Sequence, residues 1–164
     1  MKLRHFAWVI LALPLFAVGQ TINIAKETPY YDEKIIQPNI VNECTDLGAK
    51  LSTFTKSYSE KKGFTVALSD KFNSANPGYN LKLEITNAVS AGNAWMGHAK
   101  GVTISMELYK DGKQVASHTL NRNSSGGIGA GFKSSCDVLG RCTKALGKDV
   151  GKILSKWRKQ GLLK

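Results

Sequence analysis

The 164-residue sequence predicts an α+β fold, a two-layer sandwich in which a mainly antiparallel sheet of about four to five strands is backed by two helices. Between residues 64 and 121, short segments alternate apolar and polar side chains, which is typical of antiparallel strands with one face in water. One amphipathic helical pattern precedes these segments and a second follows them. Two helices flanking such a run of strands predict a single sheet with both helices packed on it.

Residues 1–19 have the three parts of a secretory signal peptide. Lys2 and Arg4 give a positive start, an uncharged stretch runs from Phe6 to Val18, and small residues precede a cleavage position before Gln20. The stretch of 13 residues is shorter than the ~20 residues that a membrane-spanning helix needs. We therefore expect an exported chain, periplasmic or secreted, with no transmembrane segment after cleavage.

Cleavage would leave one domain, residues 20–164, which is long enough to bury a core. Without Lys2 and Arg4 the formal net charge falls from +11 to +9. Most of this charge lies between residues 141 and 164, where eight Lys or Arg and one acid give a net charge of +7. Such an asymmetry is informative about partners rather than about the fold.

The first part of the domain is the least regular in pattern. Residues 21–41 mix prolines with short apolar pieces, and we expect an irregular lead-in with one strand near Ile35 or Ile40. Residues 43–60 then predict the first helix, which ends at a Lys-Lys-Gly sequence.

Strands account for the middle of the chain. Alternating patterns predict strands over residues 64–68, 79–86 and 102–108, and Asp111-Gly112 predicts a hairpin turn into a fourth strand over 113–121.

The register of this hairpin stays open. A two-residue turn would put Val115 opposite Leu108, whereas a bulged three-residue turn would align Ala116 with Met106.

A loop rich in Gly, Ser and Asn covers residues 121–135, and a basic helix follows to about residue 159. The loop resembles a phosphate-binding loop, but Phe132 separates Gly131 from Lys133, so the pattern G-x-x-x-x-G-K-[ST] fails by one residue. We expect a connection that ends in a Ser134 or Ser135 helix cap, with Asp137 in the first turn. An anion site at the helix start is the alternative.

Three cysteines predict one disulfide bond and one free thiol in an oxidising compartment. Cys44 and Cys136 each lie three residues before the apolar stripe of a predicted helix, so two parallel helices on one sheet face would bring them together. Cys136 and Cys142 would be separated by a helical rise of about 9 Å, which is too far for a bond. We expect a Cys44–Cys136 disulfide, with Cys142 as a small residue at the edge of the core and a reactive nucleophile as the alternative.

The segment 91–98 is the first candidate binding site. Trp95 and His98 lie there among small residues between two predicted strands, where a rigid scaffold presents a contact loop. In the alternative interpretation, Trp95 folds back and caps one end of the core.

A row of lysines on the C-terminal helix is the second candidate. Lys144, Lys148, Lys152 and Lys156 recur four residues apart and therefore share one helix face, as in a membrane-surface helix. The alternative is the solvated outer face of a core helix, which could still meet anionic lipid or lipopolysaccharide. Nucleic acid is a disfavoured partner because Trp157 is the only aromatic residue near this row.

The sequence predicts neither a metal site nor a cofactor nor an enzymatic activity. His98 and His118 are the only histidines after residue 19, and no Cys or acid accompanies them at metal-ligand spacing. A Ser–His–Asp triad can be assembled on paper from any chain with this many serines, so it carries no weight here.

The stretch from Gly101 to Trp157 combines the hairpin LYKDGKQVAS, the Gly-rich loop, the helix start SSCDVLGR and a closing Trp. It is similar to small exported proteins of Gram-negative bacteria that have no assigned function. The order of strands and helices also resembles envelope lipoprotein domains built as a helix-backed sheet, although no cysteine precedes Cys44. These resemblances imply an envelope protein and no catalytic residues.

Together the patterns favour an exported, non-catalytic binding or accessory protein of the cell envelope. Its partner would be an anionic envelope component or another envelope protein. A secreted effector or inhibitor that acts on another protein is the alternative. A small hydrolase is a third hypothesis, and it requires a polar cleft with a perturbed acid, base or thiol.

Overall fold

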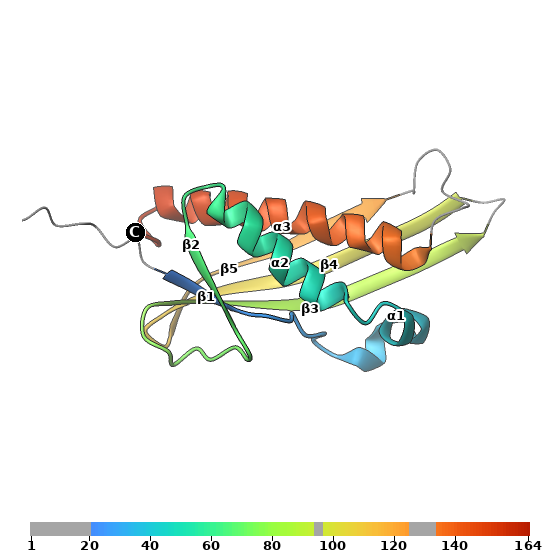
Figure 1. The fold of residues 1–164 in the computed structure, drawn as a ribbon, viewed down its shortest axis with the longest axis horizontal. Coiled ribbons are helices and arrows are strands. Elements are labelled where there is room, and N and C mark those ends of the chain that lie inside the picture. The colour runs from blue at the N-terminus through green and yellow to red at the C-terminus, as the bar shows by residue number, and fades with distance from the viewer. Residues whose placement is uncertain (1–20, 94–96, 125–133) are drawn as a thin grey trace, which may run out of the picture.

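The computed structural model describes residues 21–93, 97–124 and 134–164, so the expected signal peptide lies outside the described residues. Figure 1 shows two layers, with two long helices side by side across one face of a five-stranded sheet. This is the α+β sandwich that the sequence predicts. In chain order the elements are β1 (Thr21–Ala25), the 3₁₀ turn η1 (Glu33–Ile35), α1 (Pro38–Glu43), α2 (Leu47–Glu60), β2 (Thr65–Ser69), β3 (Tyr79–Asn93), β4 (Gly97–Lys110), β5 (Lys113–Ser124) and α3 (Ser135–Lys159).

The sheet is mixed but mostly antiparallel. Its strand order is β2-β1-β3-β4-β5, in which β1 pairs parallel with both β2 and β3, while β3, β4 and β5 pair antiparallel. The three antiparallel strands are long and extend along α3 (Figure 1). The core lies between the inner sheet face and the helices; its fully buried side chains include Ile22, Ile24, Leu81, Ile85, Ile104, Met106, Leu108, Leu47, Leu51, Leu139, Leu146, Val150 and Leu154.

The strand expected near Ile35 or Ile40 is a wrong prediction. Ile35 ends η1 and is 59% exposed, and Ile40 is buried in α1. The strand of the lead-in is instead β1, where Ile22 and Ile24 are buried. Two isoleucines are too short a period-2 pattern to predict a strand, and only parallel pairing on both sides makes this segment an inner strand.

The helix expected over residues 43–60 is in fact two helices. Cys44 is the C-cap of α1 with non-helical backbone angles, and α2 begins only at Leu47. Pro38 at the first turn can start a helix because its missing N–H would be unpaired there anyway. The break between the two helices redirects the chain, so α1 lies at one end of the sheet while α2 crosses it (Figure 1).

The two hairpins also differ from expectation in detail. Asp111 and Gly112 form the predicted two-residue turn with positive φ angles of 49° and 84°, but a bulge follows and places Ala116, not Val115, opposite Leu108. Neither register that the sequence left open is therefore correct.

The predicted contact loop at residues 91–98 is also mostly strand, because β3 and β4 stay paired as far as Asn93 and Gly97.

Candidate functional site

A disulfide bond joins the helical layer at one end. Cys44 and Cys136 are bonded as the sequence predicts, with their Cα atoms 5.2 Å apart. The bond connects the end of α1 to the first turn of α3, and α2 and α3 start at this same end and run in the same direction (Figure 1). The parallel helices assumed in the prediction are therefore present.

Cys142 is the free cysteine and is 2% exposed. Burial raises the pKa of its thiol, which disfavours the thiolate that a nucleophile requires. This environment favours a core residue over a reactive one.

The predicted row of lysines is an exposed surface. Lys144, Lys148, Lys152 and Lys156 are all exposed on α3, while Leu146, Val150, Leu154 and Trp157 on the same helix are buried. Arg141 and Lys159 extend the row at either end and are exposed as well. We call the six residues Arg141, Lys144, Lys148, Lys152, Lys156 and Lys159 the basic ridge.

Two acids lie on this helix, Asp137 in its first turn and Asp149 beside the ridge, and only Asp149 is buried. Asp149 is 7% exposed and accepts hydrogen bonds from Arg122 Nε on β5 and, at 2.9 Å, from Lys152 Nζ. Burial by itself raises the pKa of Asp149. The hydrogen bonds from Arg122 and Lys152 lower the pKa by more than burial raises it, so the pKa of Asp149 lies below its ordinary value. Lys144, Lys148 and Lys156 form no ion pair with any residue in the described ranges.

The start of α3 follows the predicted pattern. The side chain of Ser134 caps the helix by accepting a hydrogen bond of 3.1 Å from the backbone N–H of Asp137. Asp137 lies in the first turn, where a negative charge favours the helix dipole. Residues 125–133 of the Gly-rich loop lie outside the described part of the chain.

The other predicted contact residues are only partly described. Trp95 lies outside the described residues, and of His98 only the backbone is described, opposite Gly92 in the β3–β4 pair. The structure therefore places neither side chain.

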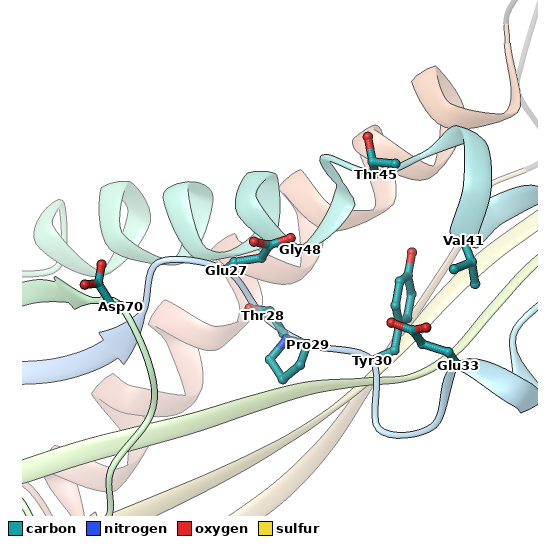
Figure 2. A pocket seen from close by; sticks show the side chains of 9 residues that line it. All are labelled: Glu27, Thr28, Pro29, Tyr30, Glu33, Val41, Thr45, Gly48 and Asp70. Atoms are coloured by element: carbon teal, nitrogen blue, oxygen red, sulfur yellow. The ribbon is translucent and has the colours of Figure 1, made fainter.

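An acidic cavity of about 440 Å³, which was not predicted from the sequence, lies beside α1 and α2 (Figure 2). Glu27, Glu33 and Asp70 contribute carboxylates, and none of the described lining residues is basic. Asp70 pairs with the exposed Lys26 at 2.8 Å. These acids are scattered in the sequence, so no local pattern could have predicted that they share one cavity.

Tyr30 also lines this cavity and supplies a neutral hydroxyl. Burial raises the pKa of Tyr30, with a smaller contribution from the charge of Glu33. The hydroxyl is buried and has no hydrogen-bond partner among the described atoms. A cavity lined by three carboxylates, of which only Asp70 is paired with a lysine in the described ranges, is chemically suited to a cationic group.

Across the described ranges no group of three or more His, Cys, Asp or Glu side chains could hold a metal ion. In the same ranges, no helix combines the length and the apolar character needed to cross a bilayer.

No protein-family model and no curated protein matches the sequence. Among solved structures, a minor lipoprotein from Acinetobacter baumannii matches with a TM-score of 0.54 at 13% identity, covering 86% of this chain and 94% of that one. A DUF330 protein from Xanthomonas campestris matches with a TM-score of 0.55 at 20% identity, covering 88% and 90%. At these identities the likeness shows a shared fold, which agrees with the helix-backed sheet of lipoprotein domains that the sequence resembles.

Proposed function

We propose that the protein is an exported, non-catalytic accessory protein of the cell envelope that binds an anionic envelope component, lipid or lipopolysaccharide, through the basic ridge. The observation that carries this proposal is the division of α3 into two faces. One face is buried in the core, and the other exposes six basic side chains of which four recur at helical spacing.

Two further observations support an extracytoplasmic location. Disulfide bonds persist mainly in oxidising compartments, and the Cys44–Cys136 bond is a structural one between elements distant in sequence. The fold is also that of a lipoprotein from a Gram-negative bacterium. Both favour the periplasm or secretion over the cytoplasm.

The strength of such binding follows from the charge of the ridge. From residue 144 to residue 156 the helix rises about 18 Å, and the long, exposed side chains of the four lysines can reach a common surface along this length. Each basic residue near an anionic membrane surface contributes about 1 kcal/mol, and the contribution is screened within a Debye length of about 8–10 Å at physiological salt. We expect a multivalent, salt-sensitive interaction.

Co-sedimentation with vesicles of phosphatidylcholine containing phosphatidylglycerol tests this proposal. The wild-type protein should bind at low salt and dissociate as salt rises, and replacing Lys144, Lys148, Lys152 and Lys156 together by Gln should weaken binding at least tenfold. The matched control replaces four exposed lysines elsewhere, Lys34, Lys62, Lys71 and Lys113, by Gln and changes the net charge equally. Equal loss in both variants, or binding that salt does not affect, would contradict a role of the ridge.

One observation favours the alternative, action on another protein. The acidic cavity of Figure 2 suits a basic side chain of a partner, and Tyr31 and Ile35 are large exposed apolar residues on the same lead-in. Absence of vesicle binding by the wild-type protein would favour this alternative.

A further inference from the structure

The inner face of the sheet changes from apolar to polar at one row near the end of the long strands. Val102 on β4 is fully buried and pairs with Ala88 on β3. Two residues earlier on β4, and therefore on the same face, Lys100 pairs with Ser90 on β3 and with Ser124 on β5. The apolar core thus ends at a lysine that is only 5% exposed.

The ammonium group of this lysine is held by two hydroxyl groups. Lys100 Nζ donates to Ser90 Oγ at 2.7 Å and to Ser135 Oγ at 2.8 Å, and the two hydroxyl oxygens are 2.9 Å apart. Ser135 is the first residue of α3, a helix of 25 residues. We call Ser90, Lys100 and Ser135 the Lys100 trio; β3, β4 and the N-terminus of α3 each contribute one member.

The charge of Lys100 is not balanced by a carboxylate. None of the ion pairs in the described ranges includes Lys100, and all twelve acidic residues of the sequence lie within those ranges. Hydroxyl groups solvate an ammonium ion but do not neutralise it, and burying an uncompensated charge is costly. The N-terminus of α3 adds positive partial charge at the same place. The electrostatics of the trio therefore favour an anion.

The hydrogen bonds also leave donors available for such an anion. Ser135 Oγ accepts from both Ser90 and Lys100, so the proton of Ser135 points outside the trio. The ammonium has three protons, and among the described residues the two serine oxygens accept two of them. A ligand that accepts from these donors would need several acceptor oxygens at different angles, which a phosphoryl group provides and a carboxylate provides less well.

We propose that the Lys100 trio is a binding site for a phosphoryl group, either inorganic phosphate or the headgroup of a phospholipid. The site does not depend on the basic ridge, because it rests on a buried lysine and two serines rather than on exposed charge. It is also distinct from a phosphate-binding loop, since its lysine comes from β4 and not from the Gly-rich segment.

Thermal unfolding of the full, disulfide-bonded protein in sodium phosphate, at ionic strength held constant with sodium chloride, tests the site. The melting temperature of the wild-type protein should rise with phosphate and approach saturation, as expected for a ligand that binds only the folded state. Lys100→Met should weaken the apparent affinity at least tenfold, whereas Lys148→Met on the ridge should leave it within twofold. A wild-type melting temperature that does not respond to phosphate, or a Lys100→Met response equal to wild type, would overturn the proposal.

A second variant keeps the test decisive if Lys100→Met folds poorly. Ser135→Ala removes one donor but leaves the Ser134 cap of α3 in place, and it should weaken phosphate binding several-fold. An unchanged affinity in that variant would likewise count against the site.

Two soluble probes separate the sources of the phosphoryl group. Protection by inorganic phosphate alone would identify a free phosphate site, and stronger protection by glycerophosphoglycerol, the deacylated phosphatidylglycerol headgroup, would identify a lipid headgroup site. Because both probes are soluble, failure of vesicle binding by the ridge would not affect this result.

Discussion

Single residues decide how closely the two helices of the outer layer pack. A Cβ atom at Gly147 of α3 would lie 2.7 Å from Cβ of Phe54 and 2.8 Å from the backbone N of Thr55, both on α2. Such distances are shorter than ordinary van der Waals contact, so the absence of a side chain at Gly147 permits this approach. Gly140 of the same helix has only the flexible side chain of Lys50 nearby, at 3.9 Å.

We expect opposite effects from alanine at these two glycines. Gly147→Ala should lower the free energy of unfolding by about 1–3 kcal/mol, because the added methyl group forces α2 and α3 apart. Gly140→Ala should leave it unchanged or raise it by about 0.5–1 kcal/mol, because alanine favours a helix over glycine. Urea unfolding measures the free energy of unfolding of both variants. An equal change in the two variants would show that the close contact at Gly147 does not contribute to stability.

The Lys100 trio is a group of residues that the sequence does not predict. Ser90, Lys100 and Ser135 lie on three different elements, and nothing in the local pattern distinguishes Lys100 from the exposed lysines of the chain. Its burial depends on the position of β4 beneath the start of α3. The alternation that buries Val102 puts Lys100 on the same strand face, but this pattern alone does not tell a buried lysine from one at an exposed strand end.

At the scale of elements, α3 is the part of the molecule that the sequence describes best. Its apolar stripe follows the helical period and its lysines recur four residues apart on another face, so both faces could be assigned from the sequence. The contacts of α3 with other segments are known only from the structure. Asp149 binds Arg122 of β5. Arg158 lies over the ring of Phe64 at 4.3 Å and donates to the carbonyl of Lys62 at 3.0 Å.

The link between α3 and β5 should depend on pH. The pKa of Asp149 is below its ordinary value, so its charged form stabilises the folded state above the unfolded-state pKa of about 3.9, and this stabilisation is lost as pH falls through the lower native pKa. Asp149→Asn should therefore lower the free energy of unfolding by about 1 kcal/mol at pH 7, since Arg122 is half exposed and its charge is screened. The difference in the free energy of unfolding between Asp149→Asn and the wild type should disappear near pH 2, where Asp149 is protonated.

Urea unfolding from pH 7 down to pH 2 measures this dependence. Glu43→Gln is the control, because Glu43 is exposed and forms no ion pair within the described ranges, and its effect should be small throughout. A constant difference between Asp149→Asn and wild type across the pH range would contradict the assigned pKa shift.

At the scale of the whole molecule, the disulfide bond connects elements that are 92 residues apart in the sequence. Closing a loop of this length stabilises the folded state by roughly 4–5 kcal/mol in the chain-entropy model, because the unfolded chain loses conformational freedom. The bond therefore has a large share in the stability of a single domain of this size.

Removing the bond tests that share. Replacing Cys44 and Cys136 together by Ser should lower the free energy of unfolding by about 2–5 kcal/mol, and adding reductant to the wild-type protein should give a similar loss. Cys142→Ala, which keeps the bond, should respond to reductant as the wild type does.

Alkylation without reductant should label one thiol, and only after unfolding, because Cys142 is buried. Labelling of three thiols would contradict the pairing of Cys44 with Cys136.

The sequence by itself determined the fold class, the positions of β2 to β5 but not the full lengths of β3 and β4, the disulfide pairing and the basic face of α3. Each of these follows from a local period or from the position of a residue relative to that period, which the chain carries wherever it folds. Tertiary structure alone decided that Thr21–Ala25 is an inner parallel strand, that a bulge sets the register of β5, and that the cavity of Figure 2 and the Lys100 trio exist. These features depend on contacts between segments far apart in the chain, and no local pattern of side chains encodes such contacts.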